Sequence, residues 1–166
     1  MTFEGRARVL GDDVNTDYII SSKRKRETID ASALKPFLLE SIDPGFAASV
    51  QPGDLLVAGA NFGCGSAMEV AATVIQAAGI RAVIARSFAR SFYRNAINNG
   101  LLAVECDTSS IEEGDRVAIR FVDGAATVDD TTRGRVMQAS PMPAIMLRIL
   151  EEGGLVGFLA KYGGWQ

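Results

Sequence analysis

The segment ANFGCGSAMEVAA (residues 60–72) places a cysteine and a serine among glycines, directly before an apolar pattern of helical period. Gly63 and Gly65 flank Cys64, and Ser66 follows. Glycines before the start of a helix leave several backbone N–H groups pointing toward one place, with no Cβ to block a ligand. Such a place suits a carboxylate or a phosphate, and it could also stabilise a serine alkoxide.

Two interpretations of Ser66 remain open at this level. In the first, Ser66 and Glu69 form a capping box, in which the hydroxyl and the carboxylate satisfy free N–H groups at the helix start. In the second, the glycine-rich backbone forms an anion site that could stabilise Ser66 as an alkoxide. The capping box does not explain the number of glycines. The segment is not a Walker loop, because the Gly-Lys-Ser/Thr sequence is absent.

The remaining nucleophiles and metal ligands are few. The chain has two cysteines, Cys64 and Cys106, and no histidine. A cysteine nucleophile would therefore lack its usual base, and we expect a small packing residue at Cys64 and a core residue at Cys106. We expect no metal or iron–sulfur cluster to be bound by this chain. Two thiols without a disulfide framework indicate a cytoplasmic protein.

Charge and hydropathy exclude several classes of protein. The 166 residues carry a net charge of −3, and no apolar run has the length of a membrane span. The N-terminus lacks the apolar core of a signal peptide. The basic run KRKR (residues 23–26) is short for a nucleic-acid site, so we expect neither nucleic acid nor membrane as partner. This run is either a solvated loop or the source of an arginine for a bound carboxylate.

The elements that must position these residues surround the motif. Short apolar runs predict strands at residues 54–59, 81–87 and 101–106. Apolar residues at helical spacing predict helices between them, at residues 66–78 and 88–100. The first helix ends at Gly79, a residue typical of helix C-termini. This alternation predicts an α/β unit whose strands run parallel.

Before the motif, residues 6–10 predict a strand and residues 31–40 a helix, with Thr28 or Asp30 as its N-cap. A polar connection is expected at residues 21–30, after the short apolar stretch at 18–20.

After the motif the pattern alternates around Asp123-Gly124, which predicts a β-hairpin, and residues 134–140 predict a third strand. A last helix is expected to start with Ser140 as N-cap and Pro141 in the first position, and to stop at Gly153. The sequence thus predicts one α/β domain over residues 1–166, with a β-rich C-terminal half.

Three segments together resemble a known family. GDDVNTDYII (11–20), GANFGCGSAMEVAA (59–72) and VIARSFARSFYRNAINNGLLAVE (83–105) are similar, in order and spacing, to the small subunits of 3-isopropylmalate dehydratases. These correspond to the swivelling C-terminal domain of the aconitase superfamily. The resemblance covers nearly the whole chain and implies a swivelling β/β/α domain, with a mixed sheet and flanking helices.

The resemblance also implies a function. In this family a separate large subunit carries a four-iron–four-sulfur cluster, and the small subunit closes the cleft over a small dicarboxylate. The serine at the position of Ser66 removes a proton next to a carboxylate. The implied substrate-binding residues are Arg24, Arg26, Thr28, Gly65, Ala67 and Met68, with Arg26 favoured over Arg24. The implied supporting residues are Asn15, Thr16, Asp17, Asn61, Gly63, Cys64 and Glu69.

The chain departs from this family at one place. The family motif reads Gly-Ser-Ser-Arg-Glu-His, with the arginine on a substrate carboxylate, whereas this chain has Ala67 and Met68 after Ser66. Hydrogen bonds to charged groups are worth roughly 1.5–3 kcal/mol each, so another cation replaces the arginine or the substrate is less polar there. The substrate expected first is 3-isopropylmalate, in leucine biosynthesis. The alternatives are another alkylmalate, such as 2,3-dimethylmalate or 2-methylmalate, and a binding module without catalysis.

Overall fold

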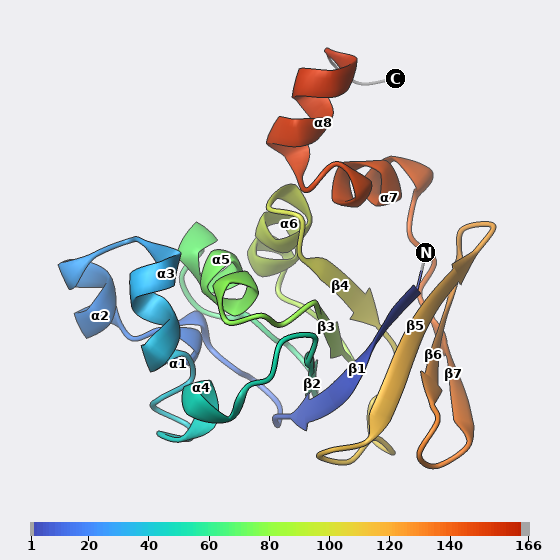
Figure 1. Ribbon diagram of the computed structural model, residues 1–166, viewed down its shortest axis with the longest axis horizontal. Coiled ribbons are helices and arrows are strands. Elements are labelled where there is room, and N and C mark those ends of the chain that lie inside the picture. Colours follow the sequence, from blue (N-terminus) through green and yellow to red (C-terminus); the bar gives the residue numbers. More distant parts are fainter. Residues whose placement is uncertain (1, 164–166) are drawn as a thin grey trace.

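Seven strands form one mixed sheet in the order β4-β3-β2-β1-β5-β6-β7 in the computed structural model, which describes residues 2–163 (Figure 1). The strands are β1 (Thr2–Val9), β2 (Leu55–Ala58), β3 (Ala82–Ala85), β4 (Leu102–Glu105), β5 (Arg116–Val122), β6 (Ala125–Asp130) and β7 (Arg135–Ala139). Strands β1 to β4 pair in parallel, and β5 to β7 pair antiparallel, beginning on the other side of β1. The predicted mixed sheet with a β-rich C-terminal half is confirmed.

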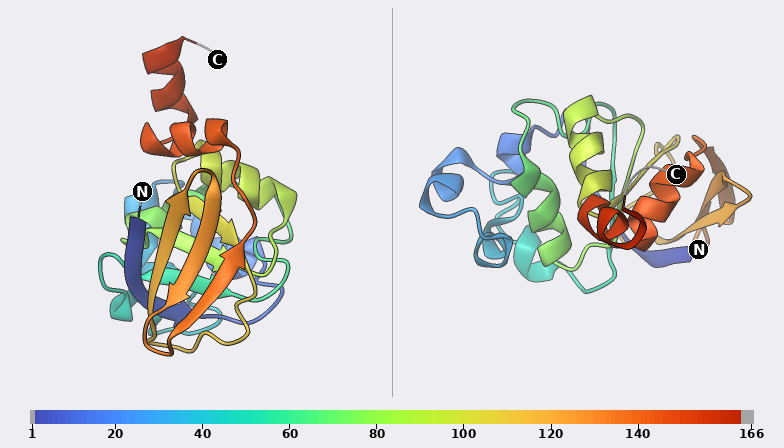
Figure 2. Two further views of the ribbon diagram at one scale, coloured as in Figure 1. Left: turned by 90° about the vertical axis from the view of Figure 1, so that its right-hand side faces the viewer. Right: turned by 90° about the horizontal axis from the view of Figure 1, so that it is seen from above.

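Strand β1 joins the two halves of the sheet. Its last residues pair in parallel with β2, with Ala7 opposite Leu55, while its first residues pair antiparallel with β5, with Thr2 opposite Arg120. Gly5 lies just before the change, where a Cβ would come within 2.0 Å of the carbonyl oxygen of Gly53. The predicted strand at residues 6–10 is therefore longer than expected, because its polar first half pairs with the hairpin (Figure 2, left).

The helices lie next to the parallel half of the sheet, some packed on it and others farther out (Figure 1). They are α1 (Thr16–Ile19), α2 (Ser22–Glu27), α3 (Ala31–Leu34), the 3₁₀ helix η1 (Lys35–Phe37), α4 (Phe46–Ser49), α5 (Glu69–Ala77), α6 (Arg90–Asn98), α7 (Ala144–Glu151) and α8 (Leu155–Tyr162). Helix α5 packs between α3 and α6, α7 packs on α6, and α8 extends away from the sheet (Figure 1).

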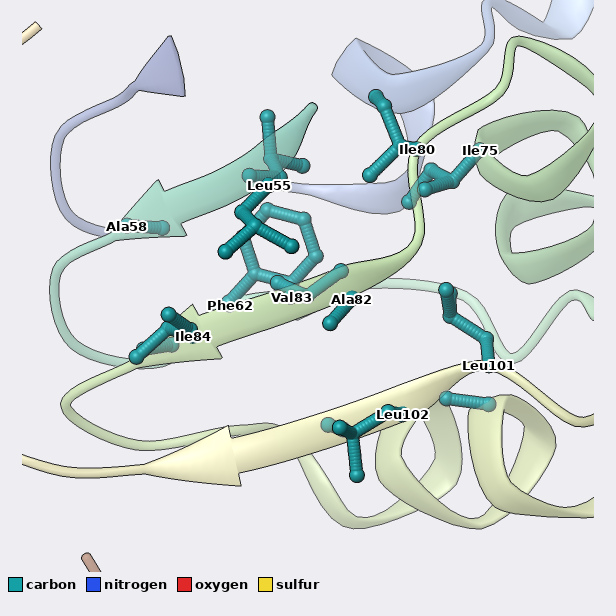
Figure 3. Packing of buried hydrophobic residues seen from close by; sticks show 14 of the residues in the cluster. Leu55, Ala58, Phe62, Ile75, Ile80, Ala82, Val83, Ile84, Leu101 and Leu102 are labelled. Atoms are coloured by element: carbon teal, nitrogen blue, oxygen red, sulfur yellow. The ribbon is translucent and has the colours of Figure 1, made fainter. Parts of the chain in front are cut away.

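The core lies between the parallel strands and the helices on them (Figure 3). All residues of β2 and β3 are buried, as expected for parallel strands that are covered on both faces. Phe62 lies in this core as well, with its ring edge-on to that of Phe92 at a centroid distance of 5.0 Å. The segment with Ser66 is thus anchored in the core by one of its own side chains.

Two of the predicted helices have other bounds than expected, and a proline explains each difference. The helix expected at residues 31–40 ends at Leu34 and continues only as η1, because Pro36 cannot donate a backbone hydrogen bond. Asp30 caps it as predicted, through a 3.1 Å bond from the N–H of Ser32. The last helix does not start after Ser140. It starts at Ala144, because Pro143 disfavours helical geometry in the residue before it.

Two further elements differ from expectation. The connection predicted at residues 21–30 contains helix α2, whose N-cap Ser21 accepts a hydrogen bond from the N–H of Arg24. Lysine, arginine and glutamate are good helix formers, and together with Ser21 they are the signal that could have indicated this helix. Helix α8 follows Gly153 and Gly154, and it was not predicted.

Candidate active site

The motif residues gather at one edge of the parallel half of the sheet. Strands β1, β2 and β3 end at Val9, Ala58 and Ala85, and because they are parallel, the loops that follow them leave the same edge. The carboxyl edge of parallel strands is the usual place for a ligand in α/β folds. The loops at residues 10–15 and 59–68 carry most of the residues singled out from the sequence.

Backbone hydrogen bonds join the first two of these loops along their length. The N–H of Gly63 donates to the carbonyl of Val14 at 2.8 Å, and the N–H of Thr16 donates to the carbonyl of Cys64 at 2.8 Å. The hydroxyl of Thr16 then donates to the carbonyl of Ser66 at 2.9 Å. The position of Ser66 is therefore fixed by residues about fifty positions earlier in the chain.

Side chains tie the start of the motif loop on both sides. The carboxylate of Asp12 accepts a 2.7 Å bond from the N–H of Ala60, and that of Asp13 accepts a 3.0 Å bond from the side-chain amide of Asn61. On the other side, the N–H of Asn61 donates to the hydroxyl of Ser87 at 2.7 Å. Asn61 thus connects the motif loop to Asp13 on one side and to Ser87 on the other.

Two glycines allow the loops to come this close. Gly63 has φ = +83°, and a Cβ there would lie 2.3 Å from the Cβ of Phe92. Gly65 has φ = +92°, and a Cβ there would lie 2.4 Å from the side-chain oxygen of Asn15. The glycines therefore serve close packing of the loop, in addition to any role in exposing N–H groups.

The structure corrects the capping interpretation of Ser66. Helix α5 begins at Glu69 with Met68 as N-cap, and no side chain bonds to the free N–H groups at its start. Residues 66–68 precede the helix, and the carbonyl of Ser66 is engaged by Thr16 instead. The predicted helix at 66–78 is thus three residues too long at its start, and the capping box of Ser66 and Glu69 is wrong.

Ser66 is exposed at this edge and lies beside free hydrogen-bond donors. Within residues 2–163, the backbone N–H groups of Gly65, Ser66, Ala67 and Met68 donate no hydrogen bond. An exposed hydroxyl next to several unpaired N–H groups at the approach to a helix N-terminus is a place where negative charge is stabilised. The unpaired N–H groups are what the anion-site interpretation requires, but they belong to the loop before α5 and not to the helix itself.

The two arginines expected to touch substrate differ in their surroundings. Arg24 is engaged within the chain: its guanidinium donates to Glu40 at 3.0 Å and lies 3.8 Å from the centroid of the Phe37 ring. The hydrogen bond with Glu40 raises the pKa of Arg24. Arg26 is exposed and makes no ion pair with any described residue. Thr28 is the C-cap of α2, and its hydroxyl accepts a 3.0 Å bond from the N–H of Asp30.

Lys25 is the residue that the sequence did not single out. Its ammonium donates to the carboxylate of Asp17 at 2.9 Å and contacts the sulfur of Met68. The hydrogen bond from Lys25, followed by one from Ser22, lowers the pKa of Asp17. A basic residue inside KRKR and an acidic residue in NTD were visible in the sequence, but no local pattern connects them.

A groove of about 520 Å³ opens beside this contact. It is lined by Lys25, Ile29, Met68, Glu69, Val70 and Thr73. A second groove, of about 570 Å³, lies between α6, β4 and α7, and none of its lining residues belongs to the loop with Ser66. We therefore place the candidate site at the first groove and the adjoining loop.

The surroundings of the two cysteines indicate no chemical role for either thiol. Cys64 is half-buried and pairs with Asn15 in an isolated β-bridge. Burial, and then the charge of Asp107, raise the pKa of Cys106 to about 12.

Within the described residues, no three His, Cys, Asp or Glu side chains form a group that could hold a metal ion. Over the same residues, no helix has the length and apolar character that a membrane crossing requires.

Comparison with known proteins gives consistent matches. Residues 20–109 match the family model of the aconitase C-terminal domain. The chain is 43% identical to the 3-isopropylmalate dehydratase small subunit 2 of Archaeoglobus fulgidus over 98% of both chains. It is 45% identical to the 3-isopropylmalate dehydratase small subunit of Caldicellulosiruptor bescii, over 96% of this chain and 95% of that one.

A solved structure agrees with these matches. The crystal structure of 3-isopropylmalate dehydratase from Methanocaldococcus jannaschii superposes with a TM-score of 0.91 at 42% identity. The superposition covers 98% of this chain and 96% of that chain. At this identity and coverage, the likeness concerns the whole fold and the order of its loops.

Proposed function

Since this chain belongs to the family of 3-isopropylmalate dehydratase small subunits, with their aconitase C-terminal domain, we propose that it is the small subunit of a two-chain hydro-lyase. The proposed reaction is dehydration and isomerisation of an alkyl-substituted malate, with 3-isopropylmalate as substrate, in leucine biosynthesis. The observation that carries the proposal is identity of 43% with a protein of this name over 98% of both chains.

In this proposal, Ser66 is the base of the reaction. Its alkoxide takes the proton from the carbon next to a substrate carboxylate and becomes a hydroxyl, while the C–H electrons begin to form the new double bond. The unpaired N–H groups of residues 65–68 stabilise the negative charge on the oxygen before the transfer. General bases of this kind contribute about 10²- to 10⁴-fold to a rate.

The other half of the reaction belongs to the partner. The word "small" in the names of the relatives implies a large subunit, and the exposed position of Ser66 leaves a face for it to cover. We place the four-iron–four-sulfur cluster on that subunit, since the described residues of this chain offer no group of ligands for it. As the double bond forms, the C–O bond of the substrate breaks, and its electrons leave with the hydroxyl group as hydroxide on the partner's side of the cleft.

Further parts of the proposal follow from the same assignment. The whole chain, residues 1–166, acts as one swivelling domain that closes over the substrate and works in the cytoplasm, without nucleic acid or membrane as partner. We prefer 3-isopropylmalate to 2,3-dimethylmalate or 2-methylmalate, and catalysis to a pure binding role, because relatives of 40–45% identity carry the isopropylmalate name.

The test is reconstitution. The chain is co-expressed with a cluster-carrying large subunit, purified without oxygen and assayed with 3-isopropylmalate and the two other alkylmalates. We expect turnover of 3-isopropylmalate by the complex and none by the isolated chain. Turnover by the isolated, metal-free chain, or a complex that acts on none of the three malates, would contradict the proposal.

A further inference from the structure

Lys25 is held at the candidate site although it is drawn away from solvent. Only 13% of its side chain is exposed, whereas Lys23 on the same short helix is exposed. An ammonium has three N–H donors and is costly to withdraw from water without acceptors for them. Its position beside the groove therefore requires an explanation.

The contacts of Lys25 satisfy only part of its hydrogen-bonding capacity. Asp17 provides one strong acceptor, at 2.9 Å. The second contact is the thioether of Met68, which is a weak acceptor. No third acceptor lies within hydrogen-bond distance among the described residues. Glu69 lines the same groove and makes no ion pair with Lys25.

Lys25 is also connected to Ser66 through its partners. Asp17 follows Thr16, whose hydroxyl bonds the carbonyl of Ser66, and Met68 lies two positions after Ser66. The ammonium and the hydroxyl are therefore fixed by the same pair of loops. A carboxylate that displaced the Met68 thioether from Lys25 would lie beside the segment that carries Ser66.

We propose that Lys25 binds a carboxylate of the substrate and supplies the positive charge that is missing at Met68. This inference rests on the proposed function and adds a binding residue to it. A carboxylate forms charge-assisted hydrogen bonds, which are about twice as strong as neutral ones, so it replaces a thioether favourably. Asp17 holds the ammonium in place, and the methionine leaves the room that an arginine side chain would fill.

The other cations of this region are less suited to the role. Arg24 is already paired with Glu40 and stacked on Phe37. Arg26 is exposed and has no partner to fix its direction within the described residues. Among the three, Lys25 alone combines a short contact to the Ser66 segment with a position in the wall of the groove.

The experiment uses the reconstituted two-chain enzyme and compares Lys25→Met with Lys23→Met. We expect Lys25→Met to lower kcat/KM by roughly 10- to 150-fold, the equivalent of one lost charged hydrogen bond, mainly through a higher KM. Lys23→Met makes the same chemical change on the exposed side of α2, and we expect less than about a threefold change. Lys25→Arg keeps the charge and is expected to retain most of the affinity.

A rescue variant separates binding from a structural role. Adding Met68→Arg to Lys25→Met returns a cation to the site without restoring the bridge to Asp17, and we expect KM to recover toward the parent value. A Lys25→Met enzyme with unchanged KM would overturn the inference. A decrease in kcat alone, with KM unchanged, would also overturn it. So would a decrease in kcat/KM that accompanies a lower melting temperature and that appears in Lys25→Arg and in the rescue variant as well.

These outcomes are distinct from failure of the proposed function. If the parent complex turns over an alkylmalate and Lys25→Met does so equally well, only the role of Lys25 is wrong. If the parent complex acts on no malate derivative, the function itself is wrong and the role of Lys25 falls with it.

Discussion

The two halves of the sheet share strand β1 but offer different opportunities for chemistry. In the parallel half, β1, β2 and β3 send their following loops to one edge, where the hydrogen bonds between residues 12–16 and 60–66 hold Ser66. In the antiparallel half, successive strands reverse direction, so consecutive loops leave opposite edges. Convergence of loops, and with it a site, is a property of the parallel half.

Charged groups in the antiparallel half illustrate the contrast. Arg133 pairs with Asp115 at 2.8 Å and with Glu112, and Asp130 is fully buried next to Asp115. These groups hold the β6–β7 turn to the start of β5. In the parallel half, by contrast, Ser66 is exposed, and the ammonium of Lys25 has one strong acceptor, Asp17, for its three N–H groups. One set of polar groups is used for stability, and the other remains open to a ligand.

The largest expected effect concerns Ser66. Replacing it by alanine in the reconstituted enzyme removes the proposed base, and we expect turnover to fall by at least about 100-fold without loss of folding. The matched change is Ser140→Ala, after β7 in the antiparallel half, where an exposed hydroxyl is removed with little expected effect. Steady-state rates and circular dichroism of both variants provide the comparison. Equal turnover rates of the two variants would contradict the assignment of catalysis to the parallel half of the sheet.

The next effect concerns glycines with left-handed backbones in each half. A methyl group at Gly65 meets the side chain of Asn15 at φ = +92°, so we expect Gly65→Ala to lower the free energy of unfolding by about 2–4 kcal/mol. Gly134 has φ = +66° and no atom within 4 Å of its would-be Cβ, so Gly134→Ala should cost only about 1 kcal/mol. Urea unfolding of the isolated chain measures both.

The Gly65 variant also has a consequence for the site. The Asn15 side chain accepts the N–H of Asp17, which in turn binds Lys25. A displaced Asn15 should therefore raise KM in the reconstituted enzyme, whereas Gly134→Ala should not. If Gly65→Ala and Gly134→Ala lowered the free energy of unfolding equally, close packing of the loops would not be the reason for a glycine at position 65.

The smallest effect concerns pH and the antiparallel half. Burial works against ionisation of Asp115, but the hydrogen bonds from Arg133 and from the N–H of Glu112 prevail and lower its pKa to about 2. Its stabilising contribution is therefore present above the ordinary aspartate pKa and is lost as the pH falls toward 2. Burial, and then the contact with Asp115, raise the pKa of Asp130, so ionised Asp130 costs stability at neutral pH.

Asp130→Asn tests this assignment. The change removes a buried charge and supplies an N–H for Asp115, so we expect stability at about pH 7 to rise by about 1 kcal/mol. The gain should shrink as the pH falls through the raised pKa of Asp130, because the parent protein is then protonated as well. Unfolding in urea at several pH values measures it, and a variant less stable than the parent at neutral pH would contradict the assignment.

Much of the fold could be predicted because local patterns agree with it. The apolar runs at β2, β3 and β4 and the Asp123-Gly124 hairpin turn were read correctly, since burial and turn geometry act on neighbouring residues. The start of α5 could not be read in this way. The carbonyl of Ser66 is taken by Thr16, a residue of a distant loop, and this contact overrides a local capping pattern.

The site shows the same division. The sequence by itself determined the family resemblance, the serine among glycines and the unusual methionine after it. Only the tertiary structure decided what the glycines accommodate and which cation lies beside Met68. Lys25 and Met68 meet because α2 and the loop before α5 are brought together by the carboxyl edge of a parallel sheet. Contacts between residues that are distant in the chain depend on the packing of whole elements, which no local pattern specifies.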